Sequence, residues 1–181
     1  NKIKIHENDI KKSKTHNELV NPIFIIGLPR SGSTLIESIL TSCEENIISF
    51  GECNVFNVSI LDQIGPKIYS KKFDKKNFKF LIDKESLNRS ILEKYSQYSD
   101  IKYERFVDKS LENFFNIELI RSIYPKAKFI HTYRNPLDSV ISIYQSMLPE
   151  LSWTHHIEDI LSYMDNYYKV LKYFKSKYPE I

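Results

Sequence analysis

The chain has 181 residues, of which 41% are hydrophobic, 13% aromatic and 27% charged. A domain of this length buries roughly 70% of the surface that its unfolded chain exposes. The composition is therefore typical of a globular protein with one main core, and it excludes disordered, fibrous and small disulfide- or zinc-stapled proteins. The formal net charge of +3 is too small for a general nucleic-acid binder, so any anion site depends on the local placement of charge.

The cysteines and the apolar runs limit the class of protein further. Cys43 and Cys53 lie outside any CxxC pattern, which predicts reduced thiols rather than a disulfide framework or a metal site. The longest apolar run, over 22–29, is far shorter than the roughly 20 residues of a membrane span. No leader is visible, and these features favour a cytoplasmic location. The chain also lacks an initiator Met and stops directly after a helical pattern, which indicates an excerpt of a longer protein.

The first half of the chain reads as a connector followed by a strand, a loop and helices. Residues 1–21 are polar and rich in lysine, and the folded domain is expected over 22–181. Residues 23–26 form a continuous β-branched and aromatic run, which predicts a strand buried on both faces. Helices are then expected over 33–43, 53–64 and 84–98. The segment 67–79 holds six lysines and is interpreted either as a solvated loop or as a surface for an acidic substrate.

The second half alternates strands with helices. A strand over 103–107 ends at Asp108-Lys109, and a helix with Ile117, Ile120 and Tyr124 on one face leads into a strand over 128–133. Asn135 and Pro136 open a helix to about residue 147, since Asn is a favoured cap and Pro suits the first helical position. A last amphipathic helix is expected over 156–177. This alternation predicts a P-loop-like, three-layer α/β fold with a central parallel sheet flanked by helices.

The loop after the first strand has the spacing of a phosphate-binding loop. Residues 27–34 fit G-x-x-x-x-G-K-[ST] except that Ser33 replaces the lysine. The backbone N–H groups and the positive helix end still provide an anion cradle, whereas the lysine that ATPases and GTPases place on the β- and γ-phosphates is missing. Arg30 supplies a cation suited to bidentate oxyanion contact instead. The alternative is that Gly27 and Gly32 serve only the tight turn.

A second anion site is expected where the strand over 128–133 ends. Arg134 stands where a nucleoside triphosphatase carries its magnesium-binding Asp, which indicates a second anionic group on the ligand and gives no support for Mg²⁺. Ser142 lies about two helical turns after Asn135 and faces the same side as the helix start. Arg134 and Ser142 are therefore expected to hold one phosphate together.

These two segments resemble a known family. Residues 22–40 and 128–145, in this order, resemble the two phosphosulfate-binding segments of sulfotransferases that depend on 3'-phosphoadenosine-5'-phosphosulfate (PAPS). The run PIFIIGLPRSGSTLIE is similar to the branch fused to tetratricopeptide repeats and akin to tyrosylprotein sulfotransferases. The resemblance implies metal-free transfer of a sulfuryl group from PAPS to a hydroxyl acceptor, with adenosine 3',5'-bisphosphate as product. It implies a donor-binding set made of Arg30, Ser31, Gly32, Ser33, Thr34 and Leu35 at the 5'-phosphosulfate, and Arg134 and Ser142 at the 3'-phosphate.

The resemblance also implies catalytic roles for Glu52, Lys109 and Arg30. Glu52 matches the Gly-Glu that carries the general base in this branch, although a free glutamate titrates near 4.3 and needs partial burial to become an effective base. The alternative is a surface glutamate that caps the helix over 53–64. Lys109 matches the lysine that approaches the bridging oxygen and the transferred group. Its alternative is a surface ion pair with Asp108.

Two rival functions and the identity of the acceptor stay open. A P-loop nucleotide kinase predicts Mg²⁺-dependent ATP binding, and a noncatalytic nucleotide-binding module predicts binding without turnover. The acceptor is expected to be a hydroxyl-bearing carbohydrate, peptide or small molecule and not a nucleic acid. Tyrosines of the last helix, such as Tyr163, either line an aromatic pocket or pack in the core. Relatives continue past the last helix, so the domain is expected to be truncated at its C-terminus, with its adenine contacts unassigned.

Overall fold

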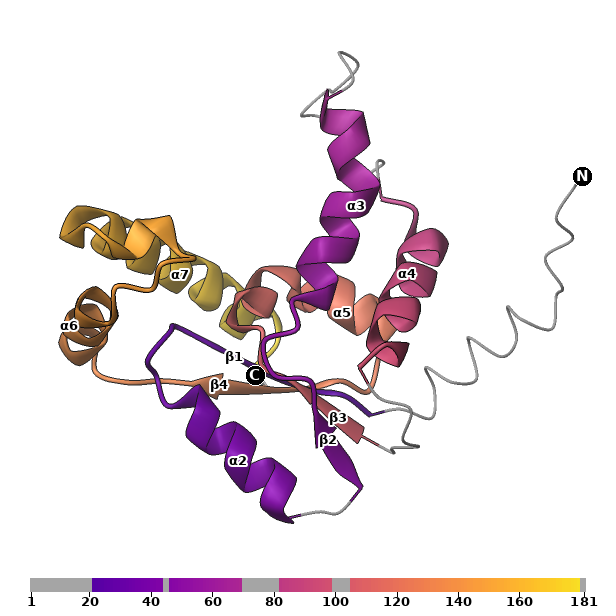
Figure 1. The fold of residues 1–181 in the computed structure, drawn as a ribbon, viewed down its shortest axis with the longest axis horizontal. Helices are drawn as coiled ribbons and strands as arrows, with labels where there is room; N and C mark the ends of the chain where they lie inside the picture. Colours follow the sequence, from indigo (N-terminus) through magenta and orange to yellow (C-terminus); the bar gives the residue numbers. More distant parts are fainter. Residues whose placement is uncertain (1–20, 44–45, 70–81, 99–104, 180–181) are drawn as a thin grey trace, which may run out of the picture.

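A central sheet of parallel strands organises the protein. The computed structural model describes residues 21–43, 46–69, 82–98 and 105–179; nearly all of the expected connector and most of the lysine-rich segment lie outside them. Four strands pair in the order β2-β3-β1-β4, and each pair is parallel (Figure 1). Their bounds are Ile23–Gly27 for β1, Ile47–Ser49 for β2, Arg105–Asp108 for β3 and Lys128–Thr132 for β4.

The strand β1 occupies the inside of the sheet. Its register pairs Ile23 with Val107 of β3 and with Lys128 of β4, and all five of its residues are buried. A strand covered on both faces and both edges has no polar side to present to water, which explains its continuous apolar sequence. The sequence analysis did not identify β2, because three residues are too short to show a period.

Helices cover both faces of the sheet, as the sequence predicts. In Figure 1, α2 packs below the sheet, whereas α3, α4, α5 and α7 lie above it, and α6 follows the carboxyl end of β4. The helices are α2 Ser33–Cys43, α3 Val55–Tyr69, α4 Lys84–Ser96, α5 Ile117–Ile123, α6 Pro136–Ser146 and α7 Ile157–Lys177, with 3₁₀ helices η2 Leu111–Asn116 and η3 Ser152–Thr154.

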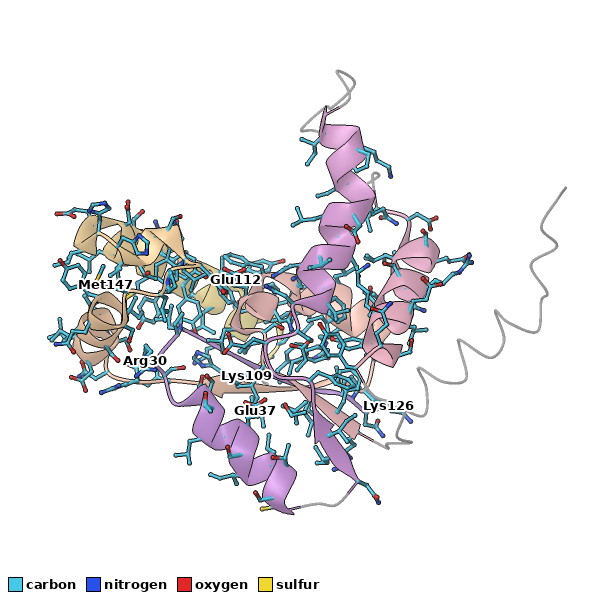
Figure 2. All side chains as sticks on the ribbon, in the orientation of Figure 1. Arg30, Glu37, Lys109, Glu112, Lys126 and Met147 are labelled. Atoms are coloured by element: carbon cyan, nitrogen blue, oxygen red, sulfur yellow. The ribbon has the colours of Figure 1, made fainter. Side chains whose placement is uncertain are left out.

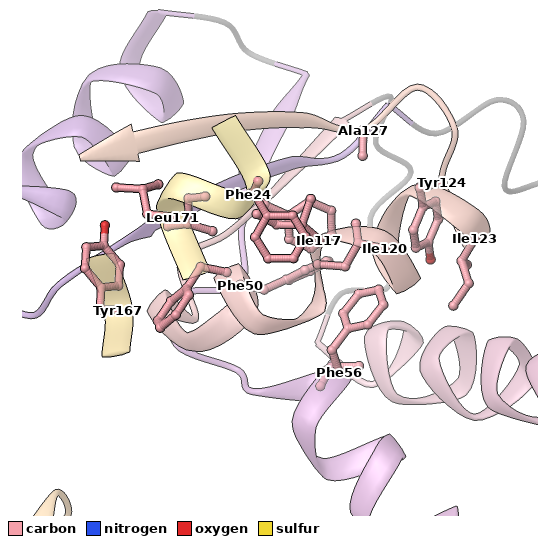
Figure 3. Close-up of a cluster of buried hydrophobic side chains, with 14 of the residues drawn as sticks. Phe24, Phe50, Phe56, Ile117, Ile120, Ile123, Tyr124, Ala127, Tyr167 and Leu171 are labelled. Atoms are coloured by element: carbon pink, nitrogen blue, oxygen red, sulfur yellow. The ribbon is translucent and has the colours of Figure 1, made fainter. Parts of the chain in front are cut away.

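Alternate residues of β1 point into two unequal cores. Phe24 and Ile26 belong to the large core beneath the upper helices, which Figure 3 shows. In it the rings of Phe24 and Phe56 meet edge to face with centroids 5.6 Å apart, a preferred aromatic geometry. Ile23 and Ile25 face the thin layer formed with α2. Packing in the large core holds the sheet in place. It thereby also positions the strand ends at the carboxyl edge.

Several local details differ from the sequence-based expectations. The helix expected over 53–64 continues as α3 through Pro66 to Tyr69, so Lys67 is helical rather than part of a loop. A proline within a helix removes one intrahelical hydrogen bond, but α3 continues for three residues after Pro66. Asn135 caps α6 as predicted, because its side chain accepts hydrogen bonds from the backbone N–H of Leu137 and Asp138. Both cysteines are free. No helix in the described ranges is long and apolar enough to cross a membrane.

Candidate active site

The carboxyl ends of the parallel strands meet at one edge of the sheet, where ligands of open α/β folds bind. A cavity of about 800 Å³ opens there. The loops that follow β1, β2, β3, β4 and α6 contribute to it, so residues that are far apart in the sequence line the same cavity. The lining comes from Gly27 and 29–34, Glu52 and Asn54, 110–112, 133–134, 148–151 with Trp153, and Tyr163.

The loop between β1 and α2 is tied to its neighbouring strand by close contacts. A Cβ atom at Gly27 would lie 2.4 Å from Oγ1 and 2.7 Å from the carbonyl oxygen of Thr132, so this position requires glycine. The hydroxyl of Ser31 donates to the carbonyl of Leu28 at 2.6 Å and lies 2.6 Å from Oγ1 of Thr132. Arg30 takes a left-handed conformation, with φ of 65°, which costs about 1–2 kcal/mol for a residue with a Cβ. Such strain at a loop facing a cavity is typical of a functional site.

The two arginines singled out in the sequence lie side by side. Nε of Arg30 donates to the hydroxyl of Ser142 at 3.2 Å, and Nη1 of Arg134 donates to the carbonyl oxygen of Arg30 at 3.4 Å. Both arginines line the cavity and are exposed. Arg134 also makes a long ion pair with Asp138, at 3.8 Å. The structure therefore joins Arg30, which the sequence assigned to the phosphosulfate end, to Ser142 of the second site.

A buried lysine lies at the end of β3. The side chain of Lys109 is 8% exposed; its Nζ donates to Oε1 of Glu52 at 2.8 Å and to Oγ1 of Thr34 at 3.4 Å, and lies 3.5 Å from Oε2 of Glu37. Burial lowers the pKa of Lys109, but the hydrogen bond and negative charge of Glu52, together with Glu37, outweigh it and raise the pKa. Lys109 is thus a protonated cation. Its ion pairs are with Glu52 and Glu37 and not with Asp108, as the alternative of a surface ion pair required.

Glu52 reaches this lysine from the loop after β2. Gly51 precedes it in a left-handed conformation, with φ of 58°, and its carbonyl accepts the backbone N–H of Lys109 at 2.9 Å. The helix α3 begins after Asn54, whose carbonyl accepts the N–H of Val58, so Glu52 is not a helix cap. The side chain of Glu52 is 66% exposed. The partial burial that the sequence analysis required of a base is therefore not present in this structure.

Asp108, next to Lys109, is completely buried and serves as an acceptor. It accepts hydrogen bonds from the hydroxyl of Tyr95 at 2.5 Å, the backbone N–H of Ser110 at 2.8 Å and the thiol of Cys53 at 3.3 Å. Burial and the charge of Asp108 raise the pKa of Cys53 to about 12 and raise that of Tyr95 well above its usual value. The thiol and the phenol stay protonated and donate: Cys53 ties the loop that carries Glu52 to the end of β3, and Tyr95 ties α4 to it.

Sequence reasoning missed Glu37, which contacts Lys109 behind the cavity lining, and two residues of the lining itself. Glu37 lies one turn after Ser33 on α2 and accepts from the hydroxyl of Ser49; the helical spacing was a usable signal for it. Glu112 lines the cavity and accepts from Nδ2 of Asn57 at 3.4 Å. Trp153, which also lines the cavity, had no local signal because it lies in a short 3₁₀ turn.

Other predicted residues fall outside the cavity lining. Leu35, assigned to the donor-binding set, is 65% exposed on α2. Leu35, Lys109 and Ser142 are not among the lining residues. His131 hydrogen-bonds to the hydroxyl of Tyr167, which agrees with its interpretation as a packing residue. Among the described residues, no group of three or more His, Cys, Asp or Glu side chains is placed to hold a metal ion.

Comparisons with known proteins give the family. An uncharacterised protein of Aquifex aeolicus (strain VF5) is 31% identical over 171 residues, which cover 82% of this chain and 21% of that protein, so the chain spans about a fifth of the relative's length. The crystal structure of sulfotransferase STF9 from Mycobacterium avium matches the fold with a TM-score of 0.54 and 13% identity, over 94% of this chain and 59% of that one. The model of the sulfotransferase family matches residues 22–181. The chain therefore belongs to the sulfotransferase family.

Proposed function

We propose that this protein transfers a sulfuryl group from PAPS to a hydroxyl acceptor. The observation that carries the proposal is the arrangement of three cations at the carboxyl edge of the sheet: Arg30 and Arg134 line the cavity after β1 and β4, and Lys109 lies behind the lining at the end of β3, 3.4 Å from the hydroxyl of Thr34. PAPS carries an anionic group at each end, the 3'-phosphate and the 5'-phosphosulfate, and therefore needs two separate anion sites. The exposed arginines with Ser142 suit the 3'-phosphate, and the N-terminus of α2 with Ser33, Thr34 and Lys109 suits the 5'-phosphosulfate.

Each step of the reaction then has a group near the bond that changes. The acceptor oxygen attacks the sulfur while its proton passes to a carboxylate oxygen of Glu52. Glu52 is 66% exposed in the free protein, so it becomes an effective base only when the bound donor and acceptor cover it. The bond between sulfur and the bridging oxygen breaks, and its electron pair stays on the 5'-phosphate of adenosine 3',5'-bisphosphate. Lys109 and the backbone N–H groups at the start of α2 stabilise that developing charge. Because Lys109 now pairs with Glu52 at 2.8 Å, it has to turn toward the donor as Glu52 takes the proton.

The finer placement within the family is part of the same proposal. We place the chain in the branch fused to tetratricopeptide repeats and akin to tyrosylprotein sulfotransferases, on the strength of the motif over 22–37. The match to about a fifth of the Aquifex protein supports further domains in the relatives. Residues 22–181 would form the catalytic domain and 1–21 a connector.

Calorimetric titration of the full-length protein tests the donor. We expect adenosine 3',5'-bisphosphate to bind with micromolar affinity that EDTA does not change, together with transfer of label from PAPS to a hydroxyl acceptor. Dependence on Mg²⁺ with a preference for ATP would identify a kinase instead. Binding of the bisphosphate without transfer to any acceptor would identify a noncatalytic module.

A further inference from the structure

The cavity continues beyond Glu52 to residues other than those assigned to the two anion sites. Asn54 follows Glu52 in the same loop, and its side-chain oxygen accepts a hydrogen bond from Asn57 at 3.0 Å. The amide of Asn57 also reaches Oε2 of Glu112 at 3.4 Å. Glu112 therefore lies on the Glu52 side of the cavity, and Figure 2 shows it near α7, apart from Arg30. Because an acceptor has to present its hydroxyl to Glu52, this part of the cavity is where the rest of the acceptor lies.

Two stacked aromatic rings form the wall beside Glu112. The rings of Trp153 and Tyr163 come from η3 and α7, are nearly parallel at 3° and have centroids 3.8 Å apart. Both residues line the cavity. Burial raises the pKa of Tyr163, and the negative charge of Glu112 raises it further, so the field of this carboxylate reaches the aromatic wall. A carboxylate next to aromatic rings is the chemistry that recognises an ammonium group.

The charges of the cavity divide into a cationic and an acidic part. Among the described lining residues, the cations are Arg30 and Arg134, both at the donor side. The lining carboxylates are Glu52, Glu112 and Glu150, and Glu52 is paired with Lys109. The partner that the described residues give to Glu112 is the neutral amide of Asn57. An anionic acceptor meets like charge here, whereas a cationic one is attracted.

We propose that the acceptor is a hydroxyl compound carrying a positively charged nitrogen, which Glu112 and the Trp153–Tyr163 stack hold while its hydroxyl faces Glu52. The proposal rests on the proposed sulfuryl transfer and names its substrate class. Glu150, in the loop after α6, adds a second negative charge at the rim. The acceptor's own charge, rather than the kind of hydroxyl, then governs selection at this end.

Acceptor series whose members share a phenol or a sugar ring and differ in net charge test the inference on the full-length enzyme. The phenol series is 4-(2-aminoethyl)phenol, 4-ethylphenol and 3-(4-hydroxyphenyl)propionate, and the sugar series is glucosamine, glucose and glucuronate. We expect kcat/KM to fall about tenfold to a hundredfold from the cationic to the neutral member and further to the anionic one. Equal or reversed ranking in an active enzyme would overturn the inference.

Variants separate this inference from the proposed function. Glu112→Gln should remove most of the preference for the cationic acceptor, and Glu150→Gln, at an exposed loop position, should reduce it without disturbing the fold. Glu93→Gln, an exposed carboxylate on α4, is the matched control and should leave the ranking unchanged. Binding of the amine to the complex with adenosine 3',5'-bisphosphate is measured in parallel. Charge-selective binding without any transfer would contradict the proposed function alone, whereas binding without charge preference would overturn the inference.

Discussion

The cations at the carboxyl edge of the sheet are of two kinds. Arg30 and Arg134 are exposed and contact a hydroxyl, a carbonyl and one distant carboxylate. Lys109 is buried and lies between the carboxylates of Glu52 and Glu37. An exposed guanidinium can bind a ligand phosphate with little rearrangement, whereas a buried ammonium has to exchange one protein partner for the ligand. We therefore predict that the arginines determine donor affinity and that the lysine acts in the chemical step.

The largest expected effect concerns Glu52, the exposed carboxylate that pairs with the buried Lys109. If this carboxylate takes the acceptor's proton, Glu52→Gln should lower kcat by about 10²–10⁴-fold, the usual contribution of a positioned base. The amide keeps an oxygen for Lys109, so donor affinity should change little. Glu85→Gln, on the first turn of α4, is the control. A kcat within a factor of two of the parent would remove Glu52 from the role of base.

Lys109→Met should have the next largest effect. It removes the cation that stabilises the leaving oxygen while keeping the length of the side chain, so kcat should fall about 10²–10³-fold. Single-turnover kinetics at saturating PAPS measures this. Lys94→Met is matched, because Lys94 pairs with Asp62 on the surface. A change confined to donor affinity would place Lys109 with the arginines instead.

The exposed side is tested with Arg134→Gln. Loss of a charge-assisted contact to a phosphate should weaken binding of adenosine 3',5'-bisphosphate about 10–100-fold and make it less dependent on salt. At saturating PAPS, kcat should be nearly retained. Arg89→Gln, at an exposed position of α4, should bind as the parent does. A loss of kcat equal to that of Lys109→Met would show that the arginines and the lysine do not have separate roles in binding and in the chemical step.

Asp108 connects the two loops of the buried side without contacting the ligand. Asp108→Asn leaves donors such as the hydroxyl of Tyr95 with a poorer acceptor in a fully buried site. It should lower the free energy of unfolding by about 1–3 kcal/mol, measured by urea denaturation. Asp62→Asn, on the surface, should cost much less. If Asp108→Asn were as stable as Asp62→Asn, the buried network would have no stabilising role.

The smallest effect near neutral pH concerns the thiol in that network. The pKa of Cys53 lies at about 12 in the folded protein and at its ordinary 9.0 in the unfolded chain. The unfolded state therefore loses this proton first, and the free energy of unfolding should fall as pH rises from 9 to 12. Cys53→Ala should flatten this part of the profile. At pH 8, iodoacetamide should modify the exposed Cys43 before Cys53, and the reverse order would contradict the buried network.

Local sequence was enough for the parts of the site built from neighbouring residues. The buried run of β1, the glycine loop and the start of α2 form one continuous segment. The sequence pattern therefore predicted the loop that carries Arg30 and the helix that begins at Ser33. The cap of α6 was equally readable, because Asn135 satisfies N–H groups only two and three residues away. Local hydrogen bonding and hydrophobic periodicity leave a signature wherever the partners are close in sequence.

The sequence alone could not identify the partner of Lys109. The sequence offered Asp108 as the neighbour of Lys109, but successive side chains of a strand end point in opposite directions. Asp108 consequently turns into the core toward Tyr95, and Lys109 turns toward the cavity. The alternation of a strand was a usable signal, although it could not name the new partners.

By itself the amino-acid sequence determined the α/β alternation, the glycine loop between β1 and α2 and the place of each arginine after its strand, because each depends on contacts within a few residues. Only the tertiary structure decided that Glu52 and Glu37 hold Lys109, and that Glu112 lies near the aromatic pair of Trp153 and Tyr163. Those contacts join side chains from different strands, loops and helices, as in the pair of Glu52 and Lys109, which are 57 residues apart. Their geometry follows from packing two cores onto one sheet, which no local pattern encodes.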